Sequence, residues 1–353
     1  MKKLIKKLRL RRKKVDLPPS SRITSETVVQ HREKILAGGR RFKYPIQYAR
    51  HRLVYNAIAI SVIAVIVALV IGWWQLYINQ NTSEFMYRVT TVLPVPVANV
   101  DGQPVLYSDY LMVYRSSVFF SEQKQQLSQK TEDGKRQLDY LKQQSMQEVI
   151  SDAYALKLSK NLGISVSEKE VDDVIKNQRQ LIDGEISQQS YDASTLDSFG
   201  WTPTQNRYYI KKGILRSKVA YEIDKDAQNA SNTAITEIKT NPSIDLKTLS
   251  ATLSSGKSVK AIYGASGWVP ANNWDGGLSN EAVKLKKLEF SPIIKSNKGD
   301  GYYIVRLLDS NEDHVNYEYI NIQLTNFIKS LEKVEKDGKV SKYISMPEAN
   351  GTK

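Results

Sequence analysis

The stretch AIAISVIAVIVALVIGWW, residues 57–74, decides the fold class of this 353-residue chain. It contains one conventionally polar side chain, and at about 1.5 Å per residue its helix approaches the roughly 30 Å thickness of a bilayer's hydrocarbon core. Rings that settle at headgroup level flank both ends: Tyr55, Trp73, Trp74 and Tyr77. The pattern predicts a transmembrane helix over 53–77. The alternative is a buried core helix of a soluble protein.

Charge predicts how this helix is oriented. Residues 1–52 hold seventeen Lys and Arg against three acidic side chains, a surplus of fourteen that equals the net charge of the whole chain. Because positively charged flanks stay in the cytoplasm, we expect a single-pass plasma-membrane protein with a cytoplasmic N-terminus and extracytoplasmic C-terminal domains. A cleaved signal peptide does not fit, because the apolar run is too long and lacks a small-x-small exit.

The basic tail opens with MKKLIKKLRLRRKKV, in which three aliphatic side chains can share one helical face. Such a segment can lie on an anionic leaflet, and a solvated tail that only sets topology is an equally good interpretation. The chain beyond the tail has no surplus positive charge to track phosphates. We therefore expect no nucleic-acid partner.

Composition excludes several kinds of chemistry. The chain has no cysteine, so disulfides, thiol nucleophiles and Cys-ligated metals are excluded. Of its three histidines, only His314 follows the apolar stretch. We expect no metal site and no cofactor.

Local signals predict the first elements after the apolar stretch. A short strand at 97–100 leads through the turn Asp101-Gly102 to a helix that Ser108 would cap. A long helix from about residue 135 carries apolar residues at mixed three and four spacing until Gly163 stops it. Residues 183–198 are polar and are expected to be partly loop.

Two capping boxes predict further helices. Ser167 to Glu170 opens a helix that reaches about residue 180, and Thr202 to Gln205 opens another that runs to about residue 223. Pro203 occupies the first helical position of the second, where its missing N–H costs nothing. The amphipathic faces of these helices must bury against each other.

Three runs now show a resemblance: VANVDGQPVLYSDY, MQEVISDAYALKLSKNLGISVSEKEVDDVI and FGWTPTQNRYYIKKGILRSKV. Together they resemble the N-terminal helical domain of the SurA, PrsA and PpiD group of extracytoplasmic chaperones. The similarity covers roughly residues 97–225, and the core LGISVS at 162–167 is its most specific part. It implies a chaperone for unfolded or newly exported polypeptides that can associate with the secretion channel.

The following region resembles a parvulin-type prolyl isomerase of the PpiC kind. Residues 245–249 are similar to the start of the first parvulin helix, 267–270 to its G-W-F-P strand and turn, and 301–305 to its G-Y-H-I-I strand. The usual first strand is missing from its place. A candidate stands at 315–322, after the last strand, and the two strands are neighbours in the parvulin sheet. The resemblance thus implies a circularly permuted module.

Parvulins grip proline with apolar side chains and twist the amide with two histidines and a Cys or Asp. By this resemblance, the apolar positions fall on Trp274 and Leu278 with Val283 nearby, and Trp268 belongs to the G-W-F-P match. The histidine positions read Tyr303 and Tyr319, and no acid or thiol follows the first helix. The implied module grips substrate but is catalytically weak or inactive. The tyrosines and tryptophans are equally explained as sheet and core aromatics.

The sequence thus predicts one transmembrane helix followed by an α+β ectodomain: a mostly helical SurA-like domain and a small antiparallel sheet with helices. We expect six segments, namely a basic tail 1–52, a transmembrane helix 53–77, a linker 78–96, a helical chaperone domain 97–225, a parvulin-like domain 226–345 and a flexible tail 346–353. Two other functions remain open, an active prolyl isomerase and an envelope scaffold or adhesin with one fixed partner.

Overall fold

The computed structural model describes residues 24–43, 45–181, 184–256, 258–273, 275–296 and 298–347. The start of the basic tail and residues 348–353 lie outside these ranges. The chain divides into two compact units, Met1–Trp74 and Gln75–Lys353, which we describe separately.

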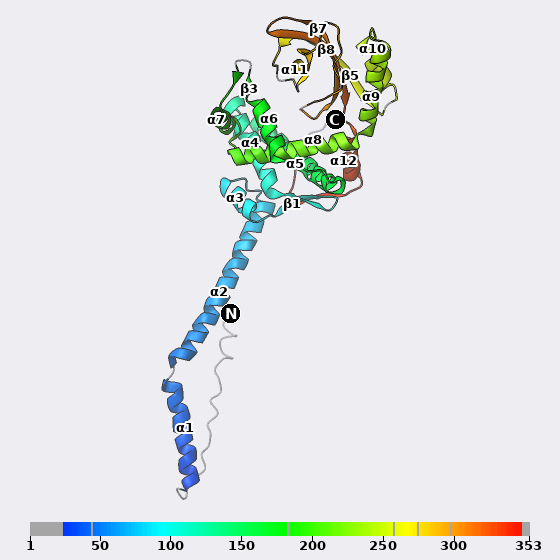
Figure 1. Ribbon diagram of the computed structural model, residues 1–353. Helices are drawn as coiled ribbons and strands as arrows, with labels where there is room; N and C mark the ends of the chain where they lie inside the picture. Colours follow the sequence, from blue (N-terminus) through cyan, green and yellow to red (C-terminus); the bar gives the residue numbers. More distant parts are fainter. Residues whose placement is uncertain are drawn as a thin grey trace. The chain divides into compact units, whose positions relative to one another are not determined.

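The described part of the first unit is helical, with α1 at Ser25–Lys43 and α2 at Pro45–Trp73 (Figure 1). The helix continues into the second unit as one π-helical segment, Trp74–Ile78. Among the described residues, one helix, His51–Ile78, is long and apolar enough to cross a membrane, and none of its apolar window is buried by the protein.

The second unit begins with a mostly helical region. Its elements are α3 (Glu84–Val92), β1 (Pro96–Val100), β2 (Gln103–Leu106), α4 (Tyr107–Gln125), α5 (Glu132–Leu162), α6 (Glu168–Gln178), β3 (Gln180–Leu181), β4 (Gly184–Glu185), α7 (Gln188–Phe199) and α8 (Pro203–Ile223). Both predicted capping boxes are present, at Ser167 and at Thr202. Gly163 ends α5 with φ of 66°, the left-handed conformation that glycine adopts without strain.

One local prediction was wrong. Ser108 does not cap α4, because the helix begins one residue earlier, where the Tyr107 backbone N–H donates to the Val95 carbonyl at 2.9 Å. The stretch expected to be partly loop is irregular at 186–187 and helical from Gln188, where the Ser187 side chain caps α7 by accepting from the Ser190 backbone N–H at 3.1 Å.

The C-terminal region is built on an antiparallel sheet in the order β5-β8-β7-β6. Its elements are α9 (Lys225–Thr240), α10 (Leu246–Ser254), β5 (Lys260–Pro270), α11 (Leu278–Ala282), β6 (Ile294–Lys295), β7 (Gly301–Ser310), β8 (His314–Gln323), α12 (Asn326–Lys336) and β9 (Val340–Lys342). The strand expected at 315–322 pairs beside 302–308, as predicted: Tyr302 is opposite Ile322 and Ser310 is opposite Val315. This region is thus a small antiparallel sheet with helices.

The two faces of this sheet pack on different layers (Figure 1). Helices α9 and α10 cover one face, where Ile304 and Ile320 join the main hydrophobic core that extends into the helical region. Helix α11 covers the other face, where Leu278 packs with Val305 and Tyr317 in a smaller core. Because successive side chains of β7 point to opposite faces of the sheet, adjacent residues of this strand lie in separate cores.

The segment 340–344 returns to the helical region, which the sequence did not predict. Strand β9 adds to β1, giving the order β2-β1-β9, and Ile344 is buried in the main core. The Phe327 ring of α12 lies 5.6 Å from the Tyr154 ring of α5. Helix α12, strand β9 and Ile344, which the sequence assigned to the sheet domain, thus pack on the helical region.

One buried carboxylate joins the two regions. Asp224 caps α9 by accepting from the Ala227 backbone N–H at 3.0 Å. Its other oxygen accepts from the backbone N–H groups of Thr325 and Asn326, at 2.7 and 3.0 Å, where α12 begins. A single side chain therefore satisfies orphan donors at the starts of two helices that lie far apart in sequence.

Candidate functional site

An open cleft of about 1650 Å³ lies in the second unit. One wall comes from α5 to α8 and the hairpin of β3 and β4. The other comes from the loop after β5, the β6–β7 turn and the start of α12. We call this cavity the client cleft, because the resemblance to extracytoplasmic chaperones predicts a site for unfolded polypeptides.

Apolar side chains line both walls of the client cleft. Ile210 of α8 is buried in a small core with Val171 and Ile175, and its partly buried neighbours Val174 and Ile214 face the cavity. Three lining side chains are substantially exposed: Leu181, Phe199 and Ile328. Exposed apolar groups in a concave surface are typical of binding sites.

A run of aromatic rings lies where the client cleft meets a second cavity of about 330 Å³. The Trp201 ring lies 4.5 Å from Tyr209 and 5.3 Å from Phe199, and Phe199 stacks on Phe120 at 5.5 Å. Trp201, Tyr209 and Phe199 line both cavities. The buried Trp201 Nε1 donor has no hydrogen-bond partner in the described residues.

Polar contacts bridge the two walls. The Tyr221 hydroxyl of α8 donates to the Gly301 carbonyl at 2.7 Å, and the Lys295 ammonium lies 5.4 Å from the Tyr221 ring. The Asn272 side chain donates to the Leu181 carbonyl at 3.0 Å. The walls are therefore held at two places, and the cavity between them is preformed.

Charged groups on the α6 and α8 rim are paired. Lys218 binds Glu170 at 2.6 Å. This hydrogen bond, followed by the one from the Ser167 backbone N–H, lowers the pKa of Glu170 to about 2. Arg216 binds the buried Asp152 at 2.5 Å, although burial still raises the pKa of that carboxyl. Both carboxylates are thus tied to structural partners.

The structure brings Tyr303 and Tyr319 together on the α11 face of the sheet. Their ring centroids are 5.6 Å apart, and the Tyr319 ring crosses the strand at Gly264, where a Cβ atom would approach it to 2.5 Å. Tyr303 is 8% exposed. Its hydroxyl donates to Asp300 at 2.8 Å and accepts from the Asn321 side chain, and burial, with this bond to Asp300, raises the pKa of Tyr303.

The apolar residues expected beside these tyrosines do not gather on one surface. Leu278 is buried in the core beneath α11, whereas Val283 and Trp268 are about half exposed and lie outside that core. Trp274 lies outside the described residues. The Asp275 carboxylate accepts from the Leu278 backbone N–H at the start of α11, at 2.8 Å, and from the Tyr317 hydroxyl at 2.6 Å, which ties the helix to the sheet.

Sequence reasoning missed the client cleft because its walls come from distant segments. The spacing of Phe327, Leu331 and Val334 is the signal that α12 has a packed face. It does not reveal that Ile328 lines a cavity opposite α6 and α8. Within the described ranges, no group of three His, Asp or Glu side chains is placed to hold a metal ion.

A comparison with known protein families finds a match in the helical region. The family model for the SurA-like N-terminal domain matches residues 46–220, which span most of α2 and the elements from α3 into α8. This match supports the SurA/PrsA chaperone family for that part of the chain. No curated protein matches the chain.

Proposed function

We propose that this protein is a membrane-anchored extracytoplasmic chaperone that holds unfolded or newly exported polypeptides in the client cleft. The observation that carries the proposal is the cleft itself, a preformed cavity of about 1650 Å³ lined by apolar side chains interspersed with amide and hydroxyl groups. The apolar groups bind side chains of an extended client, and the polar groups satisfy its backbone. The SurA-like match supports a client-binding role.

Anchoring is the second part of the proposal. The apolar helix His51–Ile78 crosses the plasma membrane once, with the basic tail in the cytoplasm. Tethering keeps the cleft concentrated at the membrane, where exported chains emerge, so modest affinity is sufficient. The length of the helix and the confinement of surplus positive charge to 1–52 support this orientation.

The third part concerns the sheet region, which we propose is a permuted parvulin-like module that does not isomerise proline efficiently. Antiparallel pairing of β7 and β8, joined by a short connection, supports the permutation. Catalysis needs groups that are free to favour the twisted amide over the planar one. The Tyr303 hydroxyl is buried and already bonded to Asp300 and Asn321, which supports a packing role.

For the full-length protein, we expect turnover of a proline-containing peptide at the uncatalysed rate. The measurement is protease-coupled cis–trans isomerisation in mild detergent, with Tyr303→Phe and Tyr319→Phe as variants. A rate above background that falls in either variant would instead support an active isomerase, the competing function for this module.

Photocrosslinking tests the chaperone function. The chain has no native cysteine, so one introduced cysteine carries one benzophenone. We expect Ser194→Cys and Ile328→Cys, on opposite walls of the client cleft, to capture many unfolded or newly exported chains in membrane vesicles. Leu196→Cys on α7 and Leu162→Cys on α5 are exposed controls that do not line the cleft.

The pattern of adducts separates the alternatives. One dominant partner from the cleft positions would favour a scaffold or adhesin over a chaperone. Equal capture from Leu196→Cys and Leu162→Cys would show that clients do not use the cleft.

A further inference from the structure

Helix α3 is the first element after the apolar helix. Only residues 79–83 separate Ile78 from Glu84, so even a fully extended connection keeps the start of α3 within about 20 Å of the end of the apolar helix. Ser83 caps α3 by accepting from the Met86 backbone N–H at 3.4 Å. The helix is therefore ordered and close in sequence to the predicted membrane boundary.

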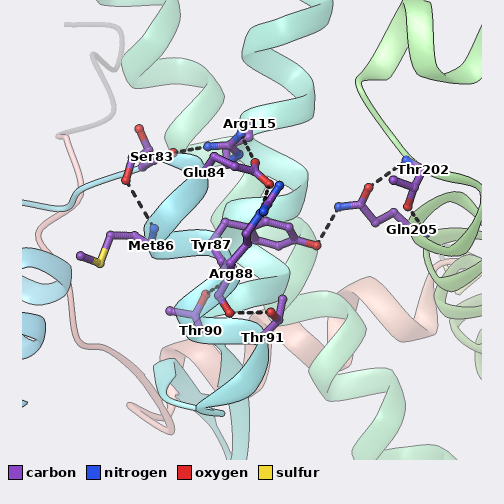
Figure 2. A network of polar contacts seen from close by, with 11 residues as sticks. Ser83, Glu84, Met86, Tyr87, Arg88, Thr90, Thr91, Arg115, Thr202 and Gln205 are labelled. Atoms are coloured by element: carbon purple, nitrogen blue, oxygen red, sulfur yellow. Dashed lines mark hydrogen bonds and ion pairs between the residues drawn. The ribbon is translucent and has the colours of Figure 1, made fainter.

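One face of α3 is fixed on the helical region, as Figure 2 shows. The Tyr87 hydroxyl accepts from the Gln205 side chain at 2.8 Å, and Thr90 is buried. Arg115 of α4 binds Glu84 at 2.5 Å and lies 5.9 Å from the Tyr87 ring. Because these contacts set the rotation of α3, they also determine which side chains point outward.

The outward face combines apolar side chains with a cation. Phe85 is 68% and Val92 78% exposed, and Leu93 at the helix end is also exposed. Arg88 shares this face, because positions i, i+3 and i+7 lie along one side of a helix. Arg88 forms an ion pair with Glu84 at 2.9 Å, and Glu84 forms a second ion pair with Arg115. The outward face therefore carries no net negative charge.

We propose that this outward face of α3 lies in the headgroup region of the membrane that the apolar helix crosses, with Phe85 and Val92 at the acyl boundary and Arg88 at anionic headgroups. The inference rests on the proposed membrane anchor. Chain connectivity favours lipid over another occupant, because the face must stay near the end of the apolar helix. Aromatic, aliphatic and arginine side chains on one helical face are typical of interfacial helices.

Single-cysteine labelling tests this contact in the full-length protein. Phe85→Cys or Val92→Cys carries an environment-sensitive fluorophore, and the protein is placed in phosphatidylcholine vesicles containing phosphatidylglycerol. We expect a blue-shifted emission that is largely lost with a nitroxide near the lipid headgroup and little affected by aqueous iodide. Val283→Cys, an exposed position on the sheet region, should show the opposite quenching.

Two further measurements sharpen the result. Adding Arg88→Gln to the Val92 label should reduce nitroxide quenching in vesicles that contain phosphatidylglycerol but not in pure phosphatidylcholine. Val65→Cys, in the middle of the apolar helix, reports the anchor independently through a nitroxide deep in the acyl chains.

The outcomes distinguish the two proposals. If Val65 is quenched in the bilayer but the Phe85 and Val92 labels respond only to iodide, the anchor stands and the interfacial role of α3 is wrong. If Val65 itself is not quenched, the anchor proposal fails. If unfolded polypeptide, and not lipid, protects the Phe85 and Val92 labels, the face binds clients and the lipid contact is excluded.

Discussion

Asp224→Ala is expected to lower the free energy of unfolding by about 3 kcal/mol, because three backbone N–H groups at the starts of α9 and α12 lose their acceptor. The site is buried, so water does not easily replace the carboxylate. Asp224→Asn should have an intermediate effect, since its one remaining oxygen cannot serve both helices. Urea unfolding in mild detergent, followed by tryptophan fluorescence and circular dichroism, measures both variants.

Asp245→Ala provides the matched control. Asp245 caps only α10, where it accepts from the Thr248 backbone N–H at 2.8 Å, and its side chain is exposed. It should destabilise clearly less than Asp224→Ala. Equal losses in the two variants would mean that Asp224 acts as an ordinary helix cap and does not join the two regions.

The features that sequence predicted best are those fixed by neighbouring residues. Both capping boxes, the left-handed Gly163 and the turn at Asp101-Gly102 depend on side chains a few positions apart. The pairing of β7 with β8 was also predicted, from the resemblance to the parvulin sheet, and the short connection between the two strands suits antiparallel neighbours. Ser187 carried the same kind of capping signal for α7, which the polar composition of that segment obscured.

The features that sequence could not predict depend on long-range packing. No local pattern in β9 indicates that it adds to β1. From sequence, Asp224 is an ordinary N-cap of α9, and only the fold shows that it also accepts a hydrogen bond at the start of α12. The candidate tyrosines illustrate the same limit. The resemblance to parvulins placed Tyr303 and Tyr319 at the positions of that family's two histidines. Only the fold shows that the Tyr303 hydroxyl is already hydrogen-bonded to Asp300 and Asn321.

The client cleft yields the second large effect. Replacing both Leu181 and Ile328 with Ser should weaken binding of an unfolded polypeptide about thirtyfold to several hundredfold, because each aliphatic side chain that a client buries contributes roughly 1 to 2 kcal/mol. Neither position should alter the fold, since both side chains are exposed and the wall contact from Asn272 uses the backbone carbonyl of Leu181.

The control pair is Leu196→Ser with Leu162→Ser, which removes aliphatic side chains of similar exposure from surfaces outside the cleft. Fluorescence anisotropy of a labelled, permanently unfolded polypeptide, titrated with the full-length protein, measures both pairs. If clients bind the cleft, only the Leu181 and Ile328 pair loses affinity, while the unfolding midpoints of both pairs stay close to that of the parent protein. A similar loss in the control pair would mean that binding follows total exposed apolar area, and the preformed cavity would then have no special role in client recognition.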